Sequence, residues 1–325
     1  AFGIYGLVGA TFNLWTPLVA GVVTDFASWR LLFYLSLPVV AATALIVAAA
    51  WREPETSGAR RPSFDVLGLG LLLVFLVPLV VALMHATDWG WGSGSVLGLL
   101  ALSGVGLVLF VRVEERARDP LIKLSLVRIP TVAGADLVYF CGQFTRIAVV
   151  LFGALYLQDD LGFSPFEAGA ALLAATVGLP LTSILAGRLT DRHGPRMPML
   201  AGLAAMLAGL VWLAIFVPTD TYVLLIPGFF VYGLSLSFFF APPQTAIMNA
   251  VPAANRGETA GVAATTRTLG GTLAIAILGS VLVATGNFAT VFWIAAGLTF
   301  AVFIAAYVLV ERPSTRVSMA SITDR

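Results

Sequence analysis

The dominant pattern along the chain is a recurrence of long apolar segments separated by short polar ones. A bilayer has a hydrocarbon core about 30 Å thick, which a helix of roughly 20 apolar residues crosses. Segments of this length recur ten times, so the pattern predicts an all-α integral membrane protein with about ten transmembrane helices. The predicted spans cover about residues 1–24, 31–50, 66–84, 95–113, 131–156, 167–187, 198–217, 222–250, 259–284 and 287–310.

The composition supports this interpretation. Hydrophobic residues make up 59% of the 325 residues and charged residues only 11%, whereas a soluble domain carries about 25% charged residues. Mean hydropathy is +0.97. The sequence has no basic run interleaved with aromatic residues, so it does not predict a nucleic-acid partner. The single cysteine, Cys141, excludes an internal disulfide and a cysteine metal site within this sequence.

The basic residues predict how the spans are oriented. One set of alternate loops, together with the C-terminal tail, holds fifteen of the eighteen lysine and arginine residues, whereas the opposite loops hold only Arg30. Because basic loops stay in the cytoplasm, the first set and both chain ends are predicted to be cytoplasmic.

The sequence begins at Ala1 and is apolar from its second residue, without the basic region of a signal peptide. We therefore expect a fragment whose N-terminal part is absent.

The fifth predicted span carries a stripe of polar residues. Its members recur at intervals of three, four and three residues, which places them within about 80° of one helical face. A charged group at mid-membrane costs about 3 kcal/mol, so it normally faces a wet cavity or a partner. Asp136 and Arg146 cannot pair directly, because ten residues separate them by about 15 Å. The alternative is that they snorkel or tie spans together. The predicted substrate and proton pathway starts with Asp136, Tyr139, Gln143 and Arg146.

Spans eight and nine extend this prediction. Ser237 and Gln244 lie seven residues apart on one face of span eight, and Pro242–Pro243 are expected to break the helix between them. Arg267 in span nine is expected either to bind a carboxylate across a domain interface or to reach the cytoplasmic headgroups. Spans seven and ten carry no charged residue between their ends and are expected to face lipid.

The loop between spans six and seven contains a spaced motif, which reads GRLTDRHGPR over residues 187–196. It resembles the G-x-x-x-D-R-x-G-x-[RK] signature of the major facilitator superfamily of transporters. The alternative is an ordinary basic cytoplasmic loop. Glycine lets the helices and the turn approach closely, and Asp191 is expected near the positive end of the following helix. The arginines are expected to pair with carboxylates or helix ends. The predicted cytoplasmic gating loop comprises Gly187, Asp191, Arg192, Gly194 and Arg196.

Other stretches resemble the fourteen-span drug:proton antiporter branch of that superfamily. The first span has Pro17 and Gly21 in register with a G-P-x-x-G-G pattern, although Thr16 and Ala20 replace its other glycines. Trp29, Arg30, Phe33 and Pro38 follow in register, and residues 156–169 and 265–281 also match segments of this branch. The resemblance implies a domain interface. Its predicted residues are Pro17, Gly21, Arg267, Gly270 and Gly271.

The resemblance also implies a domain organisation. Residues 1–50 correspond to the last two spans of an N-terminal transport domain, 51–130 to linkers plus an extra two-span hairpin, 131–312 to a six-span C-terminal domain and 313–325 to a cytoplasmic tail.

The function that the resemblance implies is multidrug efflux from the bacterial inner membrane. A monomer is expected to exchange protons for amphipathic small molecules, among membrane lipids and without a cofactor. Alternatives are an exporter of one anionic metabolite, such as a siderophore, lipid or antibiotic, and a non-transporting scaffold or receptor. A channel is disfavoured because the spans lack a repeated polar lining, and the sequence has no catalytic constellation, phosphate-binding loop or metal cluster.

Overall fold

The computed structural model describes residues 15–50, 65–117 and 124–310. In these ranges the chain is helical without strands, and nine helices are long and apolar enough to cross a membrane. This confirms the predicted all-α membrane fold. Residues 15–26 are helical and include the end of the first predicted span, whose first fourteen residues lie outside the described ranges. The other helices are α2 (Trp29–Ala50), α3 (Val66–Trp89), α4 (Gly94–Glu114), α5 (Leu124–Val127), α6 (Pro130–Ile147), the π-helix η1 (Ala148–Phe152), α7 (Gly153–Asp159), α8 (Pro165–Ala171), α9 (Leu173–Thr176), α10 (Gly178–His193), α11 (Arg196–Phe216), η2 (Val217–Thr219), α12 (Tyr222–Ala250), η3 (Ala253–Asn255), α13 (Arg256–Thr285) and α14 (Phe288–Leu309).

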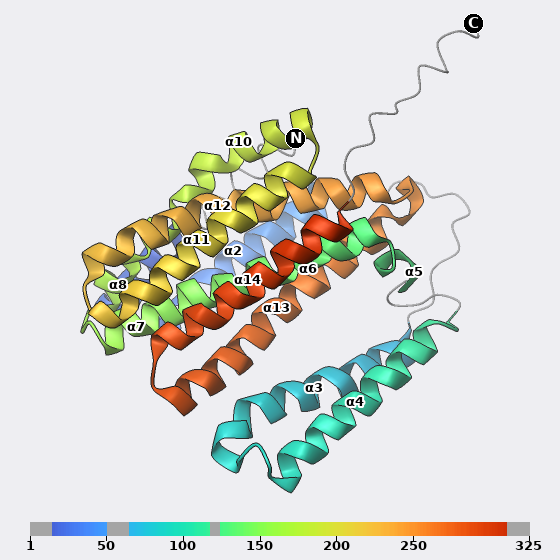
Figure 1. Cartoon of the computed structure of the whole chain (residues 1–325), viewed down its shortest axis with the longest axis horizontal. Helices are drawn as coiled ribbons and strands as arrows, with labels where there is room; N and C mark the ends of the chain where they lie inside the picture. Colours follow the sequence, from blue (N-terminus) through green and yellow to red (C-terminus); the bar gives the residue numbers. More distant parts are fainter. Residues whose placement is uncertain (1–14, 51–64, 118–123, 311–325) are drawn as a thin grey trace, which may run out of the picture.

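The helices from α6 to α14 form one bundle, and the α3–α4 hairpin lies beside it (Figure 1). Within the bundle α6 packs against α12, α13 and α14, while α11 packs against α12 and α14, and α10 packs against α12. Large side chains from several helices fill the core, because close packing is what holds helices together in lipid. The largest fully buried ones include Tyr156, Tyr232, Phe229, Phe239 and Phe292.

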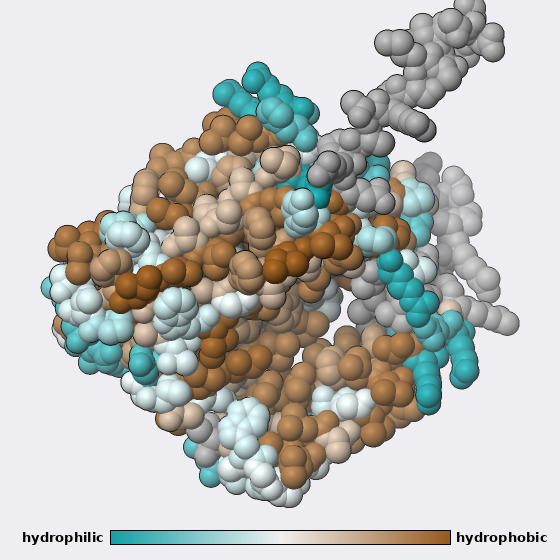
Figure 2. All heavy atoms as spheres, in the orientation of Figure 1, coloured by the Kyte–Doolittle hydropathy of each residue, from teal (hydrophilic) through white to brown (hydrophobic). Residues whose placement is uncertain are grey.

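On the face that Figure 2 shows, the surface is mainly apolar along the helices and polar towards their ends. Helix α2 has no buried residue, and α11 and α14 each bury only one side. Trp212 on α11 and Phe300 on α14, for example, are exposed. A distribution of this kind suits a protein whose solvent is lipid along its middle and water at both ends.

Short polar side chains cap the N-terminal ends of several helices. The Asp65 carboxylate accepts a hydrogen bond from the Gly68 amide (2.7 Å) at the start of α3, and Ser93 accepts one from Val96 (3.2 Å) at the start of α4. Ser164 and Glu167 form a reciprocal capping box at the start of α8. Each cap supplies a partner for an amide that has none within its own helix.

The α3–α4 hairpin is attached to the bundle through α13. The Ser280 hydroxyl on α13 donates to the Leu83 carbonyl on α3, and it also donates to Ala276 within its own helix (2.8 Å). Within the hairpin, Gly106 of α4 lies against the backbone of Val74 and Phe75 in α3. The hairpin is therefore a tightly packed pair with a polar link to one helix of the bundle.

Helix α12 differs from its prediction. It runs without interruption from Tyr222 to Ala250 and contains Pro227, Pro242 and Pro243 in its interior. The expected break at Pro242–Pro243 is therefore wrong. Neighbouring helices can support a proline-containing helix in a membrane protein, because packing and side-chain hydrogen bonds replace what the proline removes.

Candidate functional site

The predicted polar stripe lies on one helix, α6, but its members differ in burial. Asp136 is 5% exposed and Tyr139 is also buried, whereas Gln143 and Arg146 are half-buried. Both carboxylate oxygens of Asp136 are buried and have no hydrogen-bond partner among the described residues. A polar group with neither water nor a partner is costly, so Asp136 is the least satisfied member of the stripe.

Tyr139 connects the stripe to α12. Its hydroxyl donates a hydrogen bond to the Phe240 carbonyl (3.1 Å) and lies 3.0 Å from Oε1 of Gln244. Proline has no N–H, so Pro242 and Pro243 also remove the helical donors for the two carbonyls that precede Phe240. Tyr139, Gln244 and a proline-weakened stretch of α12 thus meet at one place.

Ser237 lies in a different contact, although it shares a helical face with Gln244 in sequence. Its hydroxyl is buried and donates to the Leu179 carbonyl of α10 (2.6 Å). The Thr182 hydroxyl makes a matching bond from α10 to the Leu234 carbonyl of α12 (3.0 Å). Ser237 therefore joins α12 to α10, and the structure does not bring it to Tyr139.

Sequence reasoning missed a second polar contact in the bundle core. Thr145 on α6 lies 3.4 Å from the Tyr232 hydroxyl on α12, and it donates to the Gly142 carbonyl (3.1 Å). Cys141 lies 3.6 Å from the Thr299 hydroxyl on α14. The only sequence signal is that these residues interrupt otherwise apolar spans, and it does not say which helices they join.

Arg267 projects from α13, the helix that packs most closely on α6. A Cβ at Gly270 would overlap the Phe140 carbonyl, and one at Gly271 would lie 3.2 Å from Cγ of Gln143. Gly270 is thus required for the close approach of α13 to α6, whereas Gly271 lies in tight contact with the Gln143 side chain. The assignment of both glycines to a domain interface stays a prediction. Arg267 is half-buried, lies one turn before them, and is close enough to Tyr139 to interact with it electrostatically.

The predicted gating loop is shorter than expected, because α10 continues to His193. Asp191 therefore lies exposed in the last turn of α10, and the start of α11 has no side-chain cap. The expectation that Asp191 meets the positive end of the following helix is wrong. Gly194 ends α10 with φ of +77°, where glycine is favoured. Gly187, by contrast, has open space around its Cβ position among the described residues.

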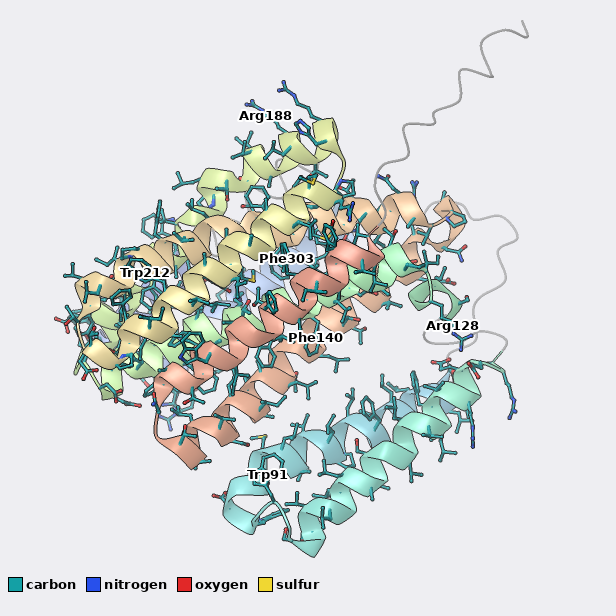
Figure 3. The ribbon with its side chains drawn as sticks, in the orientation of Figure 1. Trp91, Arg128, Phe140, Arg188, Trp212 and Phe303 are labelled. Atoms are coloured by element: carbon teal, nitrogen blue, oxygen red, sulfur yellow. The ribbon has the colours of Figure 1, made fainter. Side chains whose placement is uncertain are left out.

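Arg196 is the buried member of this loop, and its partner is a helix end. Its Nη2 donates to the Tyr307 carbonyl (2.6 Å), and its guanidinium lies 4.9 Å from the centre of the Tyr307 ring. Tyr307 belongs to the last turn of α14, where carbonyl groups make the helix end negative. Arg192 is exposed, and Arg188 points away from the bundle at the end of α10 (Figure 3).

The helix over residues 15–26 crosses α8 at two glycines. A Cβ at Gly21 would overlap the Pro165 carbonyl, and a Cβ at Gly169 would lie 2.5 Å from the Pro17 carbonyl. The predicted interface residues Pro17 and Gly21 therefore touch α8 backbone to backbone. Thr16 and Ala20 do not prevent this approach.

The remaining polar features lie outside the stripe. Partial desolvation raises the pKa of Asp160 above its usual value, and the nearby carboxylates of Asp220 and Asp159 add to the shift.

An apolar groove of about 290 Å³ lies between α11 and α14 and contains none of the predicted site residues. Phe303 is one of its lining residues (Figure 3). Among the described residues, no three His, Cys, Asp or Glu side chains are grouped to hold a metal ion.

Comparison with known proteins gives a consistent set of relatives. The sequence profile of the Major Facilitator Superfamily matches residues 135–321. The chain is 31% identical to multidrug resistance protein Stp of Mycobacterium tuberculosis over 87% of its own length and 52% of that protein. It is 26% identical to multidrug transporter protein MdtP of Bacillus subtilis, over 89% of this chain and 53% of the relative. It is 30% identical to the tetracenomycin C resistance and export protein of Streptomyces glaucescens, over 86% of this chain and 52% of the relative. The chain thus spans about half the length of these curated relatives.

Proposed function

Because the chain belongs to the major facilitator superfamily, whose substrates are small molecules, we propose that the protein is a secondary active transporter that exports drug-like, amphipathic compounds. One observation carries this proposal: relatives named for drug resistance or export match 86–89% of this chain. The chain is a multi-pass membrane protein of a transporter family rather than an enzyme. The finer proposal is a monomer in the bacterial inner membrane, surrounded by lipid, with its C-terminus in the cytoplasm.

The proposed mechanism is alternating access in a fourteen-span protein. Residues 1–50 contribute to an N-terminal half, and residues 131–312 form the C-terminal half that rocks against it. The backbone contact of helix 15–26 with α8 supports this arrangement, since it joins the two proposed halves through small residues. The attachment of the hairpin to the bundle through α13 supports its role as an accessory element. The linker 51–64 and the tail 313–325 lie outside the described residues.

The proposed pathway uses the polar face of α6 and Gln244 of α12 beside it. There Tyr139, Gln143, Arg146 and Gln244 would contact substrate. Asp136 is the proposed proton site within this chain. A buried carboxylate without a donor is costly, whereas a protonated carboxyl is neutral, so the group has reason to exchange a proton when its surroundings change. The burial of Asp136 and the lack of partners for its oxygens support this role. Ser237 would hold α12 against α10.

The test is transport by the full-length protein in proteoliposomes with an imposed pH gradient. The probes are the anion 8-anilinonaphthalene-1-sulfonate, the uncharged N-phenyl-1-naphthylamine and the cation ethidium. We expect the gradient to drive movement of at least one probe. We expect Asp136→Asn to abolish gradient-driven movement while exchange without a gradient continues. Asp159→Asn, at an exposed carboxylate, serves as the matched control and should behave as wild type.

Two outcomes would contradict the proposal. Normally inserted wild-type protein that moves no probe would favour the scaffold or receptor alternative. Gradient-driven transport that is unchanged by Asp136→Asn would remove Asp136 from the coupling mechanism, while the efflux function would stand.

A further inference from the structure

Charged side chains are rare at membrane depth in this bundle, and most of them are positive. Helices α12 and α14 contain none. Away from the ends of the spans Pro130–Asp159 and Arg256–Thr285, the charged residues are Asp136, Arg146 and Arg267. Arg146 lies near the middle of the continuous span Pro130–Asp159, two residues before the π-helix Ala148–Phe152 begins. Single turns of π-helix inside α-helices are frequent at functional sites.

The two arginines have no counter-ion in the described part of the chain. Neither guanidinium makes a hydrogen bond or an ion pair with a described residue, and both side chains are half-buried. Asp136 forms no ion pair with either of them, and its oxygens have no partner. By contrast, the uncharged polar side chains beside them, Tyr139 and Thr145, are hydrogen-bonded. An unpaired guanidinium at this depth favours an anion as its partner.

The packing of α6 and α13 determines where the two guanidinium groups lie. Gly270 lies at the level of Phe140, Gly271 at the level of Gln143 and Gly279 at the level of Phe152, so the two helices run parallel. The level of Arg267 therefore corresponds to a position about three residues before Phe140 on α6, and Arg146 lies six residues after Phe140. The two arginines are thus separated by about 14 Å along the helix axes. Gln143 and Tyr139 lie between these two levels on α6. Arg267 lies within electrostatic range of Tyr139, and Arg146 lies within range of Tyr232.

We infer that the transported compounds carry an acidic group, such as a carboxylate, sulfonate or phosphate, which Arg267 and Arg146 bind at two successive levels of the path. This inference rests on the proposed efflux function and names its substrate class. A guanidinium binds planar anions through two parallel hydrogen bonds. The apolar part of the same molecule would contact the hydrophobic side chains of α6 and α12. A cationic compound would meet two positive groups, and the one carboxylate among the three charged groups, Asp136, is 5% exposed.

The test compares two probes that differ by one acidic group. 8-Anilinonaphthalene-1-sulfonate and N-phenyl-1-naphthylamine share their rings, and only the first carries a sulfonate. We expect full-length wild-type protein in proteoliposomes to transport the sulfonate with the lower KM. We expect Arg267→Gln to raise that KM about tenfold or more, as loss of a charge-assisted hydrogen bond does, and to leave the KM of the uncharged probe nearly unchanged. Arg146→Gln should do the same, and Arg267→Lys should restore part of the affinity.

The matched control is Arg112→Gln, at an exposed arginine of the hairpin, which should leave both KM values unchanged. If the bundle variants fail to insert, the ratio of the two KM values in wild-type protein decides the question. Equal KM values for the two probes, or an equal loss for both in the arginine variants, would overturn the inference and leave efflux standing. Wild-type protein that moves neither these probes nor ethidium would overturn the efflux function and this inference with it.

Discussion

Polar residues inside the bundle fall into two groups. The first comprises hydroxyl-bearing side chains that find a carbonyl on a neighbouring helix, as Ser237 does on Leu179 and Thr182 does on Leu234. The second comprises the ionic side chains Asp136, Arg146 and Arg267, which form no ion pair among the described residues. Hydrogen bonds of the first kind hold membrane helices together. Unpaired ionic groups contribute nothing of that kind, so their presence is best explained by a binding or transport role.

Arg196 provides a test at the scale of one residue. Its guanidinium is buried, donates to the Tyr307 carbonyl and packs on the Tyr307 ring. We expect Arg196→Ala to lower the free energy of unfolding by about 2 kcal/mol, because a charge-assisted hydrogen bond to the end of α14 is lost. Thermal unfolding in detergent measures the change. Arg192→Ala removes an exposed arginine of the same loop and should change stability by less than about 0.5 kcal/mol. Equal effects of the two substitutions would show that Tyr307 does not anchor Arg196.

The sequence predicted some of these residues and not others for a physical reason. The stripe on α6 follows from helical periodicity, because one helix alone determines which residues share a face. The partner of Ser237 depends on which helix packs against that face, and local sequence does not specify it. Asp191 was misplaced because α10 continues through a polar, charged segment until Gly194 turns with a positive φ. Motif spacing places residues along the chain but does not locate a helix end.

At the scale of helices, packing decides what local propensity leaves open. Pro242 and Pro243 predicted a broken helix, yet α12 continues through them. Its contacts with α6, α10 and α11 on several sides support the helix where intrahelical hydrogen bonds are missing. The Tyr139 bond to the Phe240 carbonyl lies beside this stretch, so a proline-weakened turn lies against the polar face of α6. Helix number and type followed from hydrophobicity, whereas helix continuity depended on these neighbours.

The contact between α6 and α13 allows a matched pair of substitutions in one helix. A Cβ at Gly270 would overlap the Phe140 carbonyl, whereas one at Gly261 meets no atom within 4 Å. We expect Gly270→Ala to destabilise the protein by about 1–3 kcal/mol, because α6 and α13 must separate. Gly261→Ala removes a flexible residue from an exposed helix position and should be neutral or stabilise by up to about 1 kcal/mol. Thermal unfolding of both variants measures the difference. A Gly270→Ala variant as stable as Gly261→Ala would contradict the close approach of the two helices.

At the scale of the whole molecule, the described chain has a packed bundle, a hairpin attached to it through α13, a helix at residues 15–26 that contacts α8, and helix α2. The division into a hairpin and a six-span domain was an implication of the family resemblance. The distances between units were not predictable, because they depend on a few small residues facing one another across helices. Gly21 and Gly169 are the clearest case, since each lies against the backbone of the other helix. Backbone atoms and an edge-to-face pair of the Phe26 and Phe166 rings make this contact. Among the described residues no ion pair joins the two helices, so the contact can open without breaking one.

The contact between helix 15–26 and α8 can be weakened by one methyl group. In Gly169→Ala the added Cβ would lie 2.5 Å from the Pro17 carbonyl, so the two helices must move apart. We expect faster hydrogen–deuterium exchange in residues 15–26, because separation exposes backbone that packing now covers. Gly297→Ala on α14 adds the same methyl group where no atom lies within 4 Å, and it should leave exchange unchanged. Unchanged exchange in both variants would mean that α8 does not protect this helix. If the two helices belong to halves that rock against each other, Gly169→Ala should also shift the population towards the arrangement in which this contact is open.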